Sequence, residues 1–231
     1  MTVLKSKKAW LPWIVVGIVL VIDQTLKILI KTNMTLGETI PVIGNIFFLH
    51  FTENFGMAFG LEIPGEFGKL LLSLLRIAAL CLIGWYIMKM IKEGAPVGFL
   101  ISLGLVFGGA AGNIIDSSIY SLIFSQSTFT QVAQMFPPEG GYGTFLHGYV
   151  VDMFYAPIIR GYYPEWFPFW AGREFIFFRP VFNIADAAIT SGVFTMLIFQ
   201  KKYFNLEPKK ADKSSEETGK VSTEETTKGL S

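Results

Sequence analysis

Two aspartates near the last apolar segment of the chain are the residues best suited to do chemistry. Asp152 lies in the connection before that segment, and Asp186 lies just inside it. A carboxylate at membrane depth is costly, so an aspartate there is a candidate functional residue. Two carboxyl groups a few ångströms apart cannot both ionise, and one proton is shared between them. Such a pair can act as base and acid, and so could activate a water molecule.

Three of the expected helices each carry two polar residues three or four positions apart, a spacing that places both on one helix face. Because these helices alternate in direction, the pairs would meet at a similar depth near one face of the membrane. Chance would scatter them through both leaflets. The pairs are Asp23 and Lys27, Asn113 and Asp116, and Asn183 and Asp186.

Each pair also has a purely structural interpretation. Asp23 and Lys27 could form a simple ion pair, or Lys27 could extend outward to the interface. Asn113 could form a hydrogen bond between helices, and Asn183 is well placed to cap the last helix, which is compatible with catalysis. The glycines between these pairs indicate close helix packing rather than chemistry. They are Gly104, Gly108, Gly109 and Gly112.

The composition predicts the elements that position these residues. The chain of 231 residues is 52% hydrophobic and 16% charged, with a mean hydropathy of +0.48, which is typical of a membrane protein. Crossing the hydrocarbon core takes about 20 helical residues. We therefore expect four transmembrane helices, the first kept as a signal anchor because it lacks a cleavage site. The four apolar stretches are Trp10–Ile30, Leu70–Ile91, Pro96–Ile119 and Phe182–Gln200.

The lysines beside these stretches predict the topology, because cytoplasmic flanks collect Lys and Arg. They place both termini in the cytoplasm and the long connections, about 31–69 and 120–181, on the outer face. We expect residues 1–200 to form one membrane domain and residues 201–231 a disordered cytoplasmic tail. The net charge of +1 gives no indication of a nucleic-acid partner.

The outer connections are expected to add to a mainly α fold. Residues 39–51 read as one or two strands of a small sheet above the helices. The stretch 120–149 predicts an amphipathic interfacial helix followed by a glycine turn. The stretch 155–180 mixes aromatics with arginines, which suits either a mobile cover over the site or padding at the headgroup level.

Other catalytic classes are disfavoured by the few residues that could serve them. Cys81, the one cysteine, is expected toward the inner half of its span, whereas His50 and His147 lie in the outer connections. This separation argues against a cysteine protease. Two histidines leave no HExxH helix and no plausible zinc cluster. The sequence therefore predicts neither a metal nor another cofactor.

Five segments, in order, resemble one family: lipoprotein signal peptidase, also called signal peptidase II. Each is short, but the set in this order is highly specific and covers all four apolar stretches. The segments are Asp23-Gln24-Thr25-Leu26-Lys27, Asn54-Phe55-Gly56-Met57-Ala58-Phe59, Gly108-Gly109-Ala110-Ala111-Gly112-Asn113-Ile114-Ile115-Asp116, Val150-Val151-Asp152 and Phe182-Asn183-Ile184-Ala185-Asp186.

This resemblance implies an aspartic endopeptidase of the bacterial inner membrane that cuts prolipoproteins before their diacylglyceryl-modified cysteine. The implied partners are this precursor and membrane lipid, with no obligate protein partner, and the site faces the outer side. Asp152 and Asp186 match the catalytic pair. The implied supporting residues are Asp23, Lys27, Asn54, Gly56, Asn113, Asp116 and Asn183.

The chain departs from the family pattern at Ser117, where an arginine commonly follows the Asn-x-x-Asp motif, so Asp116 could lack its usual partner. Arg76 is a candidate replacement, and the alternative is that it extends to the outer interface. The two long outer segments, 120–149 and 155–180, are a second departure.

Two rival functions use the same features. A small proton-coupled transporter or a lipid-handling membrane protein also places carboxylates inside a helical bundle. Transporters usually carry internal repeats or broken helices near the midplane, whereas here the acids gather near one interface and no repeat is evident. A purely structural scaffold would leave Asp116, Asp152 and Asp186 unexplained.

Overall fold

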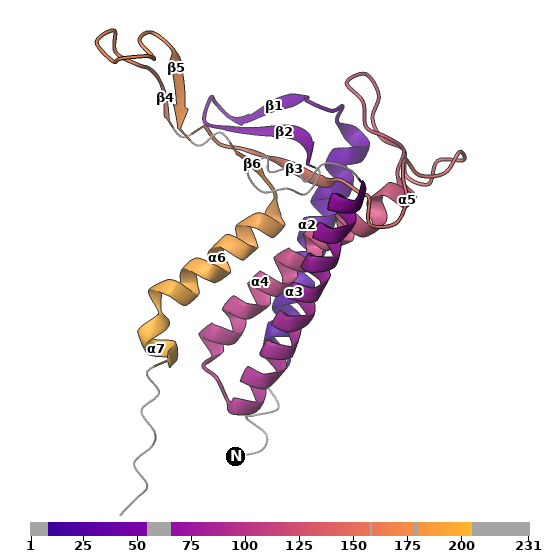
Figure 1. Ribbon diagram of the computed structural model, residues 1–231, viewed down its shortest axis with the longest axis vertical. Coiled ribbons are helices and arrows are strands. Elements are labelled where there is room, and N and C mark those ends of the chain that lie inside the picture. The colour runs from indigo at the N-terminus through magenta and orange to yellow at the C-terminus, as the bar shows by residue number, and fades with distance from the viewer. Residues whose placement is uncertain (1–8, 55–65, 158, 178–179, 205–231) are drawn as a thin grey trace, which may run out of the picture.

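The computed structural model describes residues 9–54, 66–157, 159–177 and 180–204. Most of the fold is a bundle of four helices with a small sheet at one end (Figure 1). The described chain starts and finishes at the opposite end of the bundle, as the predicted topology requires. The helices are α2 (Leu11–Asn33), α3 (Glu66–Glu93), α4 (Val97–Ile115) and α6 (Ile184–Ile198), with a short α7 (Gln200–Phe204) after α6.

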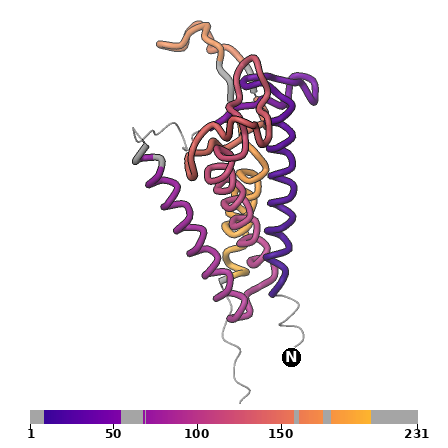
Figure 2. The backbone as a smooth tube through the Cα atoms, turned by 90° about the vertical axis from the view of Figure 1, so that its right-hand side faces the viewer, coloured from indigo at the N-terminus to yellow at the C-terminus, as the bar shows by residue number. Residues whose placement is uncertain are grey.

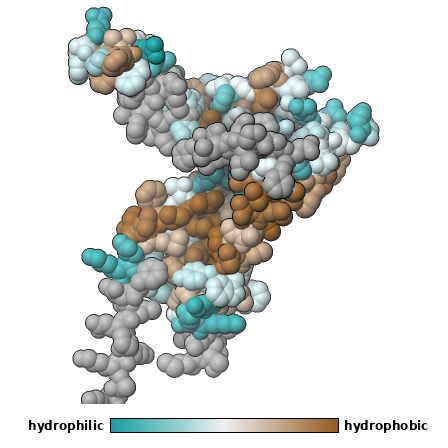
Figure 3. Space-filling model, viewed as in Figure 1, coloured by the Kyte–Doolittle hydropathy of each residue, from teal (hydrophilic) through white to brown (hydrophobic). Residues whose placement is uncertain are grey.

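Among the residues that the structure describes, three helices are long and apolar enough to cross a membrane, over Leu11–Asn33, Leu70–Glu93 and Val97–Ile123. Helix α6 is apolar but shorter, with 15 residues, or about 22 Å at the usual helical rise. The predicted fourth span is divided because Val181–Phe182 form a strand and Asn183 caps the helix behind them. Figure 3 shows hydrophobic residues gathered on the helical part, with hydrophilic residues beyond both ends.

Helix α4 is the centre of the bundle and packs against α2 and α6. Its glycines allow the close approach that the sequence predicted. A Cβ atom at Gly104 would lie 2.7 Å from the carbonyl oxygen of Pro12 in α2, and one at Gly109 would lie 2.3 Å from that of Ala185 in α6. Helix α3 is packed more loosely and leans away from the others toward the sheet end (Figure 2).

The sheet is antiparallel and brings two distant parts of the chain together. Its strand order is β1 (Thr39–Ile43), β2 (Phe47–Asn54), β3 (Val150–Tyr155) and β6 (Val181–Phe182). The strands predicted within 39–51 are therefore confirmed. Thr52 pairs with Asp152, and Phe154 pairs with Phe182. Because β6 leads directly into α6, its pairing with β3 places Asp152 close to the start of α6.

The connection after α4 corrects one prediction. Helix α4 continues as a π-helical segment, Asp116–Tyr120, and a single turn, α5 (Ser121–Ile123). Residues 124–149 contain no further helix, so the expected interfacial helix is not present. Loop hydrogen bonds satisfy the backbone instead, such as those from Leu36 N to Thr128 O and from Ser125 N to Gln134 O.

A buried ion pair fixes this connection to the sheet. Lys31, at the end of α2, is fully buried and pairs with Glu53 of β2. Its ammonium group also donates to Ser127 Oγ at 2.8 Å and lies over the rings of Phe124 and Tyr142. A hydrophobic core that includes Phe51 and Val151 packs beside it.

The segment predicted as a cover forms a separate hairpin of β4 (Ile159–Tyr162) and β5 (Glu174–Phe177). It projects beyond the sheet on the side away from the helices (Figures 1 and 2). Several aromatic side chains are exposed there, namely Tyr162, Trp166, Phe169 and Trp170.

Some predictions fall outside the described residues. These are Gly56 with the rest of the turn after Asn54, the lysines ahead of the first helix, and the tail beyond residue 204.

Candidate active site

Asn183 fixes Asp186 at the first turn of α6. Its Oδ1 accepts a hydrogen bond from Asp186 N at 2.9 Å, and Asp186 Oδ2 accepts one from Asn183 N at 3.2 Å. This reciprocal pair is a capping box, which satisfies backbone donors that the helix leaves unpaired. The predicted cap is confirmed, and it holds the Asp186 carboxylate at the end of the helix.

The side-chain amide of Asn183 also connects α6 to β3. Its Nδ2 donates to Asp152 Oδ1 at 2.7 Å and to Val151 O at 3.2 Å. Asn183 is fully buried, and Asp152 is only 5% exposed. One residue therefore holds both aspartates, Asp186 through the cap and Asp152 through its amide.

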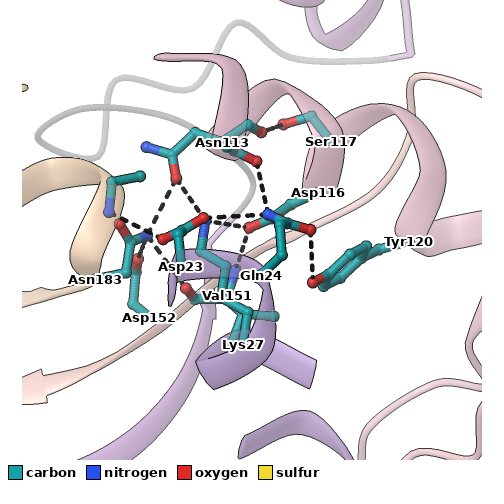
Figure 4. A network of polar contacts seen from close by, with 12 residues as sticks. Asp23, Gln24, Lys27, Asn113, Asp116, Ser117, Tyr120, Val151, Asp152 and Asn183 are labelled. Atoms are coloured by element: carbon teal, nitrogen blue, oxygen red, sulfur yellow. Dashed lines mark hydrogen bonds and ion pairs between the residues drawn. The ribbon is translucent and has the colours of Figure 1, made fainter. Parts of the chain in front are cut away.

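Asn113 of α4 completes the link between the two acids. Its Nδ2 donates to Asp186 Oδ1 at 2.9 Å, and its Oδ1 accepts from Asn183 Nδ2 at 3.2 Å. The same oxygen accepts from Lys27 Nζ at 2.9 Å. Asp152 thus receives a hydrogen bond from Asn183, and Asp186 receives one from Asn113. Figure 4 shows the hydrogen bond between the two amides.

A buried charged cluster lies behind the amides. Lys27 Nζ is 2.9 Å from Asp23 Oδ2 and 2.7 Å from Asp116 Oδ2, and all three side chains have no exposed surface. Lys27 therefore does not extend to the interface. Gln24 Nε2 donates to Asp116 Oδ1 at 2.9 Å, and the Tyr120 hydroxyl donates to Gln24 Oε1 at 3.1 Å.

This cluster holds the backbone immediately before each candidate catalytic aspartate. Asp23 Oδ1 accepts from Ala185 N at 2.9 Å, next to Asp186. Asp116 Oδ2 accepts from Val151 N at 3.3 Å, next to Asp152. Because Lys27 joins Asp23 to Asp116, it also joins the supports of the two acids.

Arg76 is not the replacement partner suggested for Asp116. Asp116 pairs with Lys27, which it shares with Asp23. Arg76 instead lines a cavity together with Asp152 and Asp186, and Asp186 is the carboxylate that acts on it electrostatically.

The cavity measures about 760 Å³ and lies between α3, α4 and α6 below the sheet. Both aspartates open onto it. Its walls are polar near the sheet and apolar along the helices. The polar lining includes Asn54, Arg76, Asn113, Asp152 and Asp186, and the apolar lining includes Ala79, Leu80, Ile83, Ala110, Ile114 and Ile189.

The electrostatics of Asp152 suit a group that holds a proton. Burial, and then the nearby Asp186 charge, raise the pKa of Asp152 to about 7, against opposing effects of Lys27 and the Asn183 hydrogen bond. The charge of Asp186 therefore favours the protonated form of Asp152, as is usual where two carboxyl groups line one site.

The predicted site residues largely come together. Asp23, Lys27, Asn113, Asp116, Asp152, Asn183 and Asp186 form one connected network, and Asn54 lines the cavity wall. His147, which was not predicted to belong to the site, forms hydrogen bonds with Thr144 Oγ1 and Phe145 O. Within the described ranges, no three His, Cys, Asp or Glu side chains are grouped to hold a metal ion.

Sequence reasoning missed several supporting residues. Gln24 stands beside Asp23, and that adjacency was the available signal for it. Tyr120 gave no signal, because its contact depends on the π-helical segment that begins at Asp116. Such segments often occur at functional sites, but hydropathy does not reveal them.

Comparison with known proteins identifies the family of this chain. The family model described as signal peptidase (SPase) II matches residues 15–201. The chain belongs to the signal peptidase II family. A lipoprotein signal peptidase of Porphyromonas gingivalis is 48% identical over 182 residues, 78% of each chain. One of Amoebophilus asiaticus is 36% identical over 85% of this chain and 80% of its own.

Solved structures support the fold of this signal peptidase II family member. A bacterial membrane enzyme solved by the in meso method at 2.3 Å resolution has a TM-score of 0.56 and 22% identity, covering 87% of this chain and 93% of its own. A second, at 1.9 Å resolution, has a TM-score of 0.55 and 24% identity over 83% and 92%. At these identities the likeness concerns the fold alone.

Proposed function

We propose that this signal peptidase II family member is an aspartic endopeptidase that cuts diacylglyceryl-modified prolipoproteins on the amino side of the modified cysteine. Asp152 and Asp186 form its catalytic pair. The observation that carries the proposal is that two bonded amides, Asn183 and Asn113, hold both acids at the wall of one cavity.

In this mechanism Asp152 is the acid and Asp186 the base. The raised pKa of Asp152 favours its protonated form near neutral pH. Asp186 takes a proton from water as the water oxygen attacks the scissile carbonyl carbon, and Asp152 gives its proton to the carbonyl oxygen. As the C–N bond breaks, Asp186 returns a proton to the leaving amine and Asp152 recovers one from the intermediate.

The asparagines and the lysine cluster position the two acids without reacting. Asn183 and Asn113 orient the carboxyl groups through neutral donors, so they add no charge to the pair. Lys27, Asp23 and Asp116 hold the backbone before each acid. Preorganised groups of this kind need no rearrangement during the reaction.

The proposed topology puts four helices across the bacterial inner membrane, with both termini in the cytoplasm. Helix α6 would then use the flanking strand and α7 to complete its crossing. The sheet and the acids would lie toward the outer face. The cavity between α3, α4 and α6 suits a precursor whose acyl chains run along apolar helix walls.

A reconstituted assay tests this function. The purified protein in lipid vesicles is given a precursor peptide whose cysteine carries the diacylglyceryl group, and the same peptide without it. We expect mass spectrometry to detect a product that begins at the modified cysteine, from the modified peptide only. Absence of cleavage, or equal cleavage of both peptides, would overturn the proposal.

A further inference from the structure

Arg76 is a charged residue in a helix wall that the mechanism above does not use. It is half-buried on α3 and lines the cavity that contains both aspartates. The next cavity residues along α3 are apolar, namely Ala79, Leu80 and Ile83. A charged side chain inside a membrane helix is costly and usually faces a functional cavity.

The hydrogen-bond donors of the Arg76 guanidinium are not used by the described residues. In the part of the chain that the structure describes, it forms no hydrogen bond or ion pair, and its one electrostatic interaction is with Asp186. Asp186 is held by Asn113 and the α6 cap instead. A guanidinium presents five N–H donors in a planar fork, so Arg76 is available to a bound molecule.

The position of Arg76 indicates which atoms it would meet. It lies where the cavity changes from polar, at Asn113 and the two acids, to apolar, at Leu80 and Ile83. A diacylglyceryl group also changes from polar to apolar at its ester groups, which join the glycerol to the acyl chains. With the cysteine at the acids and the acyl chains along the helices, the esters fall at this boundary.

We propose that Arg76 is a specificity-determining residue that binds an ester carbonyl oxygen of the diacylglyceryl group. This inference rests on the proposed function and names the part of the substrate that the site reads. An arginine suits the task because it stays charged and its hydrogen bonds to carbonyl oxygens are charge-assisted. The apolar walls then accept the chains with little selectivity.

The test compares a precursor carrying the diacyl (ester) lipid with one carrying a dialkyl (ether) lipid of equal chain length, which lacks the carbonyl oxygens. The wild-type protein should favour the ester by roughly ten- to hundredfold in kcat/KM, mainly through KM. Arg76→Met should remove that preference, because kcat/KM for the ester precursor should fall to the value for the ether precursor. Lys89→Met, on the same helix but half-exposed at its other end, should keep the preference.

Two outcomes overturn the inference. The first is equal kcat/KM of the wild-type protein on the two lipids, a result that needs no variant to fold. The second is an Arg76→Met protein that keeps the ester preference. If the pH profile of that variant also shifts equally for both lipids, Arg76 only balances the charge of Asp186. Failure of the wild-type protein to cut the ester precursor at all would instead remove the proposed function.

Discussion

At the scale of single residues, Asn183 has two separable roles. Its oxygen caps α6, and its amide nitrogen donates to Asp152, Val151 and Asn113. The sequence predicted the cap, because asparagine before an apolar run is a common helix start. It could not predict the second role, since the contact to Asp152 depends on the pairing of β3 with β6.

Substitution of Asn183 should separate the two roles. A serine keeps a capping oxygen but is too short to reach Asp152, whereas an alanine loses both functions. We expect both variants to lose activity by roughly ten- to hundredfold, because this factor corresponds to the free energy of one hydrogen bond to a charged group. Asn183→Ala should be less stable than Asn183→Ser by about 1 kcal/mol. Activity assays and thermal unfolding in detergent measure this, and an Asn183→Ser enzyme of wild-type activity would exclude the positioning role.

The pKa of Asp152 predicts a pH dependence. Its rise from the ordinary value of 3.8 to about 7 means that Asp152 loses its proton as the pH passes about 7. A profile of kcat/KM should therefore fall on the alkaline side near pH 7. Asn183→Ser should move this limb to higher pH, because the lost hydrogen bond favoured the charged form. An unshifted limb in that variant would contradict the assignment to Asp152.

The same shift affects stability with a definite sign. Because the folded protein binds the Asp152 proton more tightly than the unfolded chain, this group contributes stability that is complete below about pH 4. The contribution is lost as the pH rises through about 7. Asp152→Asn removes the titrating group, and a comparison of the two stability profiles isolates its effect.

At the scale of elements, the approach of α4 to α6 sets the position of Asp186. Gly109 packs against the carbonyl of Ala185, the residue before Asp186. The glycine spacing predicted close packing of this helix, since such spacings let helix backbones approach, but it did not identify α6 as the partner. The sequence did not predict the π-helical segment that places Asp116 and Tyr120, because its residues are ordinary for an α-helix.

Gly109→Ala should therefore impair both stability and activity. The added methyl group would lie 2.3 Å from Ala185 O and 2.8 Å from Ile189 Cγ1, so α6 must shift. We expect a loss of about 1–3 kcal/mol, as for overpacked cores, and reduced cleavage. Gly17→Ala is the matched control, because nothing lies within 4 Å of its Cβ position. Equal behaviour of the two variants would argue against the contact with α6 as the cause.

At the scale of the whole molecule, hydropathy predicted the helical bundle but not the outer connections. Apolar runs indicate helices because a bilayer leaves no other partner for backbone groups. Residues 124–149 form no helix. They are held beside the sheet by loop hydrogen bonds and by the contact of Ser127 with the buried Lys31–Glu53 pair. Contacts between residues so distant in sequence leave no periodic signal, and the same holds for the hairpin of β4 and β5.

The proposed orientation can be tested with single cysteines. Cys81 is exposed and unpaired, so Cys81→Ser provides a suitable background. Trp166→Cys, in the exposed hairpin, should react with a membrane-impermeant maleimide in intact cells. Glu93→Cys, at the far end of α3, should react only after the membrane is permeabilised. If Glu93→Cys reacted in intact cells and Trp166→Cys did not, the orientation would be the opposite of the one proposed.

The central claim concerns the two acids, and single-turnover cleavage of the lipid-modified precursor by Asp152→Asn and Asp186→Asn tests it most directly. Each substitution removes one carboxylate while keeping nearly the same side-chain size, and Glu165→Gln in the exposed hairpin is the control. We expect each aspartate variant to fold and to lose at least about a hundredfold in rate, while the control keeps the wild-type rate. A folded Asp152→Asn or Asp186→Asn protein that cleaves at close to the wild-type rate would contradict the catalytic pair.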